Sequence, residues 1–458
     1  MEYRIRSRLI LGISFLLISF SVGAQVSSKG LTPPGNTYRS FQDGSIARDS
    51  GLNQPLDLLN DFYPAIEVVV TQSDNIRRRS DVEEDDLRVL VSPSFAYRTN
   101  IGRHQFFVGY NGSFSFHDEF DSEDVDSNVL SARVGLDFNR SWDLDVFASL
   151  GNSFEERGIS GSRPFDPIVD VGLDQGPDEV DFSSYGADLV YGRKLNKFKA
   201  VLGFEKLVTS FTNNGQGDDN DFGGRDRDVD SIHLDLDYSV WANTSVFARI
   251  QHFDTDFDRQ LNSIDSEQTD FLIGARWAPS QSFSGVLGVG RTDRTLDDEL
   301  REDFDGSIYY ANLRYAFSPI SVLQFAASRA VEETGDDIAS FYVSELFALA
   351  WDYDISELLS FNAFFKVVDD DYGTGRQDEF TDWGIGLDYA WKNYLSVGIF
   401  YGEVDGESSI GAFDYQENYY GIRLRSDIRS LFSGSRKNSR RSREPDSFDY
   451  PKRTSRAQ

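Results

Sequence analysis

The sequence contains no cysteine, and that absence removes several kinds of chemistry at once. Without thiols the chain cannot form a disulfide framework, use a thiolate nucleophile or bind a metal through sulfur. Only four histidines are present, His104, His117, His233 and His252, and they are scattered along the chain. The sequence shows no carboxylate or serine partner for them at the fixed spacing that a catalytic or metal site needs. We therefore expect no enzymatic activity, no cofactor and no metal centre.

Basic residues are also in short supply. The chain has 76 acidic residues against 45 basic ones, a formal net charge of -31, which argues against binding to the phosphates of nucleic acid. Long apolar runs are missing after the N-terminus, and the mean hydropathy is -0.43, which excludes a bundle of membrane helices. A membrane β-barrel stays possible, because half of each strand and all of its loops are polar.

The N-terminus carries the one long apolar run, from Leu9 to Val22, behind three arginines. Small residues follow it, so the pattern predicts a signal peptide over residues 1–24 with Gln25 as the new N-terminus. A single transmembrane anchor is the weaker alternative, because the run is too short. We expect export from the cytoplasm of a Gram-negative cell and a periplasmic extension over residues 25–62, which is rich at first in Ser, Gly and Pro.

Apolar and polar residues alternate strictly in the stretch SIHLDLDYSV, Ser231–Val240. This period of two is typical of a strand with one apolar and one wet face. The same unit repeats from about residue 63 to Phe432, with connections that are alternately short and long. About eighteen strands with short periplasmic turns and long acidic extracellular loops predict a transmembrane antiparallel up-and-down β-barrel. The alternative is a soluble sandwich, whose apolar faces would look inward.

Aromatic residues favour the barrel over the sandwich. They fall on the apolar face at the short-turn end of their strands, as expected for a belt at a membrane interface. This set comprises Tyr97, Phe138, Tyr191, Tyr238, Trp277, Tyr315, Tyr353, Tyr389 and Trp391. The opposite face carries many charges, and burying these in a soluble core would be prohibitive. We therefore expect the apolar face to look outward into lipid.

Several short motifs in the first strands resemble those of a known family. They include Asp74-Asn75-Ile76 after the first strand, Ser92-Pro93 in the second, the turn at Arg103, Tyr110 in the third, and NSFEERG, Asn152–Gly158. The stretch from about residue 60 to the last strand resembles the putative beta-barrel porin family that is often encoded with exopolysaccharide or capsule biosynthesis genes. The resemblance implies an outer-membrane barrel linked to surface polysaccharide, and it carries over no catalytic residue.

Three acidic segments between the predicted strands resemble cation sites in composition. The longest is Asn213–Asp230, with Asp218, Asp219, Asp221, Asp226 and Asp228, and the others are Asp121–Ser127 and Val367–Gly375. The first lacks the ordered spacing and terminal Glu of a calcium-binding hand. Because like charges repel and keep a segment extended, we expect solvated, disordered loops at all three places.

Charged residues on the wet face are the candidate lumen-facing side chains. Both signs are interleaved, which predicts a network of salt bridges, whereas a ring of one sign would set ion preference. The candidates are Arg133, Asp137, Asp188, Asp235, Asp237, Arg249, Arg276, Arg314, Lys366, Asp388, Arg423 and Arg425.

The last segment, residues 433–458, is basic in an otherwise acidic chain. A disordered periplasmic tail is one interpretation, and a docking arm for periplasmic export components or an anionic partner is the other. We expect outer-membrane lipid and lipopolysaccharide around the barrel, and a role in exopolysaccharide export or surface assembly. The alternatives are a non-specific diffusion porin for small hydrophilic solutes and a structural or adhesive barrel.

Overall fold

A computed structural model gives the architecture. It describes residues 61–427, apart from residues 155–156, 159–175, 178, 193–196, 212–225, 242, 259–263, 279, 281, 299–300, 334–338, 374 and 393. The predicted signal peptide, residues 25–60 of the predicted N-terminal extension, Phe432 and the basic tail lie outside the described residues, whereas residues 61–62 of that extension begin the first strand. No helix among the described residues is long and apolar enough to cross a membrane.

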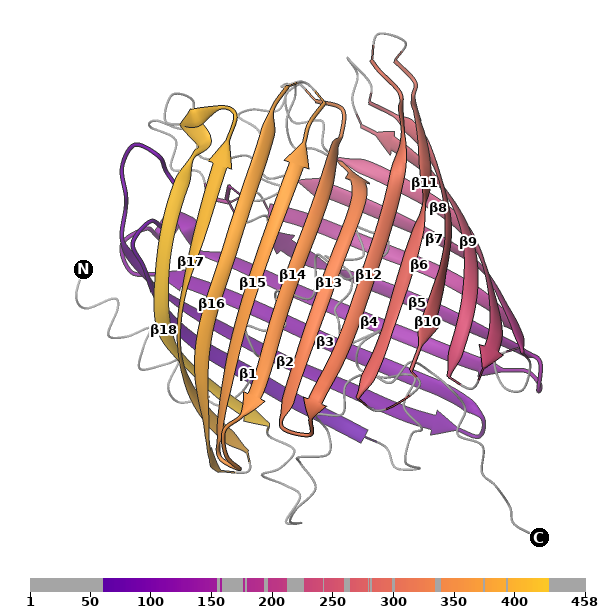
Figure 1. Cartoon of the computed structure of the whole chain (residues 1–458), viewed down its shortest axis with the longest axis horizontal. Helices are drawn as coiled ribbons and strands as arrows, with labels where there is room; N and C mark the ends of the chain where they lie inside the picture. Colours follow the sequence, from indigo (N-terminus) through magenta and orange to yellow (C-terminus); the bar gives the residue numbers. More distant parts are fainter. Residues whose placement is uncertain are drawn as a thin grey trace.

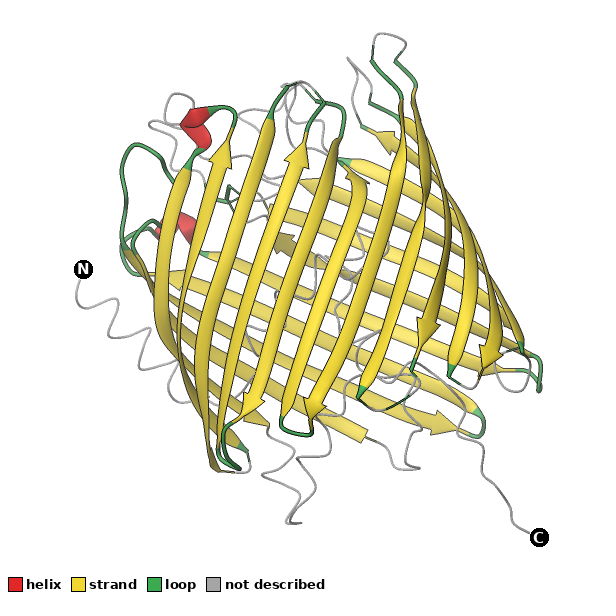
Figure 2. Cartoon of the chain, in the orientation of Figure 1, coloured by secondary structure: helices red, strands yellow, loops and turns green. Residues whose placement is uncertain are grey.

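Eighteen antiparallel strands form one closed barrel (Figures 1 and 2). Each strand pairs with the next, and β1 closes the ring on β18, from Ala65 opposite Asp427 to Ser73 opposite Tyr419. The strands are β1 (Asp61–Ser73), β2 (Asp86–Ile101), β3 (His104–His117), β4 (Val125–Asp137), β5 (Trp142–Phe154), β6 (Glu179–Tyr191), β7 (Phe198–Phe211), β8 (Arg227–Trp241), β9 (Thr244–Phe257), β10 (Ser266–Trp277), β11 (Phe283–Leu296), β12 (Phe304–Ser318), β13 (Ser321–Glu332), β14 (Tyr342–Asp354), β15 (Leu359–Asp371), β16 (Gln377–Lys392), β17 (Leu395–Ser408) and β18 (Tyr415–Asp427). The predicted barrel and its strand number are confirmed.

The apolar face of each strand looks outward. In β8, Leu234 and Leu236 are each 37% exposed, whereas the intervening Asp235 is 9% exposed on the inner side. The same alternation continues around the ring, because the paired residues of neighbouring strands share a face. This is the facing of a membrane barrel, and it excludes the soluble sandwich.

Aromatic rings form a belt around the outside at the short-turn end. The ring centres of Trp277 and Phe283 are 5.9 Å apart, and those of Phe283 and Tyr315 on the next strand are 6.2 Å apart. Similar contacts join Trp142 to Tyr191 at 5.0 Å and Trp351 to Tyr353 at 5.8 Å. Belts of this kind lie at a membrane–water interface, where the rings have an apolar and a wet side.

The two ends of the barrel differ in their connections. The turns at the end that carries the aromatic belt are short, such as residues 102–103 between β2 and β3. The connections at the opposite end are longest in the first half of the chain, for example residues 155–178 between β5 and β6. Toward the C-terminus the connections at the two ends differ little in length, since only residues 372–376 join β15 to β16. Two 3-10 helices, η2 (Asp121–Glu123) and η3 (Gly411–Phe413), lie at this long-loop end (Figure 2).

Candidate functional site

The inner wall of the barrel carries all twelve candidate lumen-facing residues. Their positions in the strand registers place them opposite the outward apolar face, and none is fully exposed. They are Arg133, Asp137, Asp188, Asp235, Asp237, Arg249, Arg276, Arg314, Lys366, Asp388, Arg423 and Arg425. These twelve residues lie on β4, β6, β8–β10, β12, β15, β16 and β18, and together they give the inner wall charges of both signs.

A series of polar side-chain pairs runs across β6 to β10. Asp188 faces His233 at 3.6 Å, and Asp235 accepts two hydrogen bonds of 2.5 Å from Arg249. Two residues further along β8, Asp237 accepts a hydrogen bond from Arg276 on β10. Each of these pairs links different strands, so the side chains are held along the wall.

Other pairs fasten the remaining parts of the wall. Arg133 donates to Asp145 at 2.9 Å, and Arg425 lies 3.6 Å from Glu67 across the seam between β18 and β1. Arg423 donates to both oxygens of Asp388 at 2.8 and 2.6 Å. The structure thus brings nine of the twelve candidates into these pairs, and Asp137, Arg314 and Lys366 occupy further inner-wall positions.

Aromatic rings lie against inward-facing glycines along the same wall. A Cβ atom built on Gly274 would be 2.4 Å from the ring of Phe247, and one on Gly288 would be 2.4 Å from the ring of Tyr310. The Phe364 ring covers Gly384 in the same way, at 2.7 Å. Glycine weakens a strand, but here it leaves room for a ring to lie along the backbone. The rings therefore follow the wall and do not project across the lumen.

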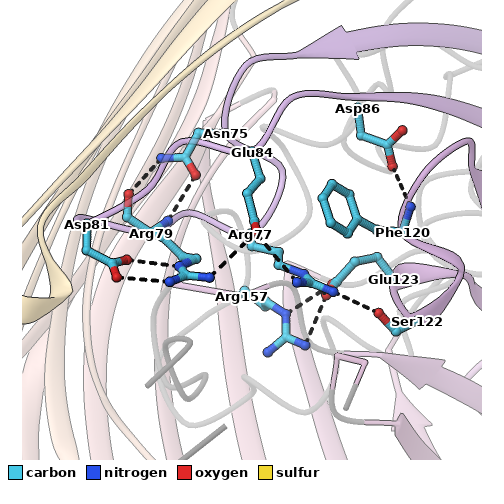
Figure 3. Close-up of polar contacts among 10 residues, drawn as sticks. All are labelled: Asn75, Arg77, Arg79, Asp81, Glu84, Asp86, Phe120, Ser122, Glu123 and Arg157. Carbon is cyan, nitrogen blue, oxygen red and sulfur yellow. Dashed lines mark hydrogen bonds and ion pairs between the residues drawn. The ribbon is translucent and has the colours of Figure 1, made fainter. Parts of the chain in front are cut away.

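The β1–β2 loop, residues 74–85, folds over the inner side of the long-loop end (Figure 3). We call it the mouth strap. The Asn75 side chain is fully buried; its amide donates to the carbonyl oxygens of Arg79 and Gln416 at 2.9 and 3.0 Å. It also accepts a hydrogen bond of 3.0 Å from the Arg79 backbone N–H. The first half of the strap is therefore a fixed turn that is fastened to β18.

Glu123 of η2 is a buried carboxylate between two arginines, as Figure 3 shows. Arg77 of the mouth strap donates to it at 3.1 Å, and Arg157 donates at 3.0 and 3.2 Å. The Arg77 guanidinium also lies 4.4 Å from the centre of the Phe120 ring. The prediction of a solvated, disordered loop at Asp121–Ser127 is wrong here, because these cations neutralise the carboxylate and hold the turn.

Asp86, at the start of β2, organises the neighbouring β3–β4 loop. One of its oxygens accepts hydrogen bonds from the backbone N–H groups of Asp118 and Glu119, and the other accepts one from that of Phe120, at 3.1–3.3 Å. A carboxylate that collects several N–H groups satisfies loop donors that would otherwise need water. These hydrogen bonds hold the Phe120 ring against the Arg77 guanidinium.

Glu417, on the inner face of β18, fastens the other side of the mouth strap. It accepts hydrogen bonds of 2.8 Å from Arg78 and from the Ser73 hydroxyl. Arg78 also donates to the carbonyl oxygen of Arg157 at 2.9 Å, and the Tyr415 hydroxyl donates to that of Gly158 at 2.8 Å. The chain just after β5 is thus bound to β18.

The acidic segment Val367–Gly375 is also ordered where the structure describes it. Asp370 is buried on the inner face, and the Tyr372 ring is stacked on that of Tyr342 at 5.1 Å. Arg376 lies 4.4 Å from the Tyr372 ring and donates to Asp378. The prediction of a disordered loop is wrong here as well, because residues 367–371 belong to β15 and the Tyr342 and Arg376 side chains pack against Tyr372.

The third acidic segment is described only in part. Asp218, Asp219 and Asp221 lie outside the described residues. Asp226 accepts hydrogen bonds from the Phe211 N–H at 2.7 Å and the Ser210 hydroxyl at 2.8 Å, and Asp228 is 2.8 Å from Lys206. Among the residues that the structure describes, no group of three or more His, Asp or Glu side chains is arranged to hold a metal ion.

The mouth residues were not among the sequence candidates. Arg77, Arg78, Glu123, Arg157 and Glu417 lie in loops or at strand ends, where the period of two gives no information. The signal that could have found them is the run of three arginines, residues 77–79, in a chain whose long connections are rich in acidic residues.

Comparisons with known proteins give one family and several structures. The sequence model described as putative beta-barrel porin 2 matches residues 62–427. The chain is similar to the structure of Pseudomonas aeruginosa OpdO, with a TM-score of 0.45 and 12% identity over 80% of this chain and 97% of that one. It is similar to P. aeruginosa OpdK with vanillate (TM-score 0.44, 10% identity, 79% and 98% covered) and to the Acinetobacter baumannii siderophore receptor PirA (0.40, 10%, 80% and 81%). The search of curated proteins gave no match.

Proposed function

The chain belongs to the putative beta-barrel porin 2 family, and from that premise we propose that it is an outer-membrane pore through which a saccharide polymer is exported or assembled at the surface. The observation that carries the proposal is the inner wall, where fixed ion pairs alternate with aromatic rings that lie flat on glycines. The outward apolar face and its aromatic belt support placement in the outer membrane.

Saccharides fit such a wall for a chemical reason. A pyranose ring has a rim of hydroxyl groups and a flatter face of C–H groups, so it uses polar and aromatic contacts together. Carboxylate–arginine pairs offer donors and acceptors, and the partly exposed ring of Phe364 offers a flat apolar surface, whereas the rings of Phe247 and Tyr310 are buried in the wall. Barrels of 16–18 strands are wide enough to leave an aqueous channel between such walls.

A diffusion pore for small hydrophilic solutes is the second candidate function. The observation in its favour is that both charge signs line the wall in neutralising pairs, which gives a wet surface without an evident preference for one solute. Both candidates are non-enzymatic, and the paired state of the inner carboxylates supports that part of the proposal.

Planar-bilayer recordings test the saccharide proposal. Linear dextran oligosaccharides should block the current through the purified barrel at concentrations where polyethylene glycols of similar size do not. The variant Phe364→Ala should weaken that block, because it removes a partly exposed ring from the inner wall. Phe365→Ala removes an outward ring from the same strand and serves as the matched control.

Gene deletion tests the same proposal in cells. Loss of the barrel should reduce surface or secreted polysaccharide and leave the uptake of small hydrophilic solutes unchanged. Normal polysaccharide combined with slower solute uptake would instead support the diffusion pore. Absence of any oligosaccharide-specific block in the bilayer would count against saccharide passage.

A further inference from the structure

We infer that the mouth strap, residues 74–85, limits the size of what can pass the long-loop end of the barrel, and that Asn75, Arg77 and Arg78 hold it there. The inference assumes that the barrel is a pore, as proposed above, but it does not depend on the identity of the solute. The inference gives a role in size selection to the loop that joins the first two strands (Figure 3).

The contacts of the strap show that it lies inside the ring. Glu417 belongs to β18, whereas Arg157 follows β5, and both are bound to Arg78. Strands β18 and β5 are separated by β1 to β4, which is about 24 Å along the wall at a spacing of about 4.8 Å per strand. The Arg78 side chain can reach both partners only if the chain at Arg157 has left the wall and crossed the mouth toward β18.

The backbone of the strap supports a specific role for the Arg78 side chain. Arg78 has φ = +53°, in the left-handed region that non-glycine residues rarely adopt. A glycine would satisfy this turn without strain, so the conformation has to be held by the contacts around it. Those contacts include the hydrogen bond from the Arg78 N–H to the Asn75 carbonyl oxygen at 3.1 Å and the two side-chain bonds described above.

The charges of the strap explain why it stays in place. The side chains of Glu123 and Glu417 are 4% and 8% exposed, and each is neutralised by an arginine of the strap. If the strap moved away, Glu417 would lose its arginine partner and Glu123 would keep only Arg157. Leaving a buried charge uncompensated is strongly unfavourable, so the closed position is favoured over a wide range of salt concentrations.

A different arginine in the same loop offers a matched control. Arg79 pairs with Asp81 at 2.9 Å and lies 3.7 Å from Glu84, and both partners belong to the strap itself. The hydrogen bond from Arg79 lowers the pKa of Asp81 below its usual value, so the pair is formed at neutral pH. Because both partners lie within the same loop and Asp81 is exposed, Arg79→Gln should leave the strap bound to β18 and to Glu123.

The test uses the full-length barrel in planar bilayers, with polyethylene glycols of increasing size as probes. The charge-balanced variant that combines Arg78→Gln, Glu417→Gln and Asn75→Ala removes the contacts of Arg78 and Asn75 with β18 without stranding a charge, and Arg77→Ala releases the strap from Glu123. Both should raise the single-channel conductance and shift the exclusion limit to larger polymers. Arg79→Gln should change neither. Heat-modifiable migration in gels confirms that each variant is folded before it is recorded.

The outcomes are separable from those of the saccharide proposal. If the folded barrel with Arg78→Gln, Glu417→Gln and Asn75→Ala keeps the conductance and exclusion limit of the unchanged protein, the strap does not limit size. The inference fails equally if Arg79→Gln has the same effect as releasing the anchors, or if no barrel conducts at all. A wider exclusion limit together with no oligosaccharide-specific block would support the strap while refuting saccharide passage.

Discussion

The buried pair Arg423–Asp388 gives the sharpest test of how the inner wall is held together. The Arg423 side chain is 1% exposed, and its guanidinium donates to both carboxylate oxygens of Asp388. Asn362 adds a hydrogen bond of 2.9 Å to the same carboxylate. A Cβ on Gly398 would lie 2.3 Å from Asp388 Oδ1, so this glycine provides the space that the pair occupies.

Replacing Arg423 with Gln should destabilise the barrel by about 3–5 kcal/mol, because it leaves a buried carboxylate without its cation. Asp388→Asn should also be costly, but the double variant should cost clearly less than the sum, since it removes both charges. Urea unfolding of the barrel in lipid vesicles, followed by tryptophan fluorescence, measures all three free energies of unfolding.

The pair Arg79–Asp81, in the mouth strap outside the membrane, is the control. The Asp81 side chain is 46% exposed, so Arg79→Gln should cost far less than Arg423→Gln. If Arg423→Gln proves as mild as Arg79→Gln, or if the costs of the two buried substitutions simply add, the inner pair does not hold the wall as we argue.

Three further predictions follow from the facing, the topology and the charge. Leu236→Arg places a charge on the lipid-facing side and should cost about 2–4 kcal/mol in vesicle unfolding, whereas Asp237→Asn should assemble almost normally; the reverse order would mean that the facing is inverted. A cysteine at Glu119 should react with an impermeant thiol reagent on intact cells and one at Arg103 should not, and labelling of Arg103→Cys alone would invert the topology. Because both signs of charge are paired along the inner wall, reversal potentials in a KCl gradient should stay near zero, and a strong preference for either ion would contradict this.

The barrel could be predicted from the sequence because its signal is local. The alternation in Ser231–Val240 depends only on neighbouring residues, and it identifies the strand and its two faces without knowledge of its partners. The same alternation, repeated, gives the strand number and the positions of inner residues such as Asp235 and Arg423.

The mouth could not be predicted in this way. Arg78 and Glu417 are 339 residues apart, and no local pattern links a loop arginine to a glutamate at the start of the last strand. Glu123 appeared to be one more member of an acidic run, because repulsion between like charges was the only interaction visible in the sequence. The arginines that bury it come from the β1–β2 loop and from the chain after β5, and folding alone brings them together.

The seam between β1 and β18 links the assembly of the barrel to the completion of its mouth. Ser73 and Arg78, near the beginning of the barrel, bind Glu417 near its end, and the first of these contacts spans 344 positions of the chain. Contacts of such separation form late, after the intervening chain has been ordered. An assembling barrel that lacks its eighteenth strand has an unpaired edge and an unfastened strap at the same time. The last strand therefore closes the ring and fixes the entrance in one step, so partly assembled barrels would differ from finished ones in permeability as well as in stability.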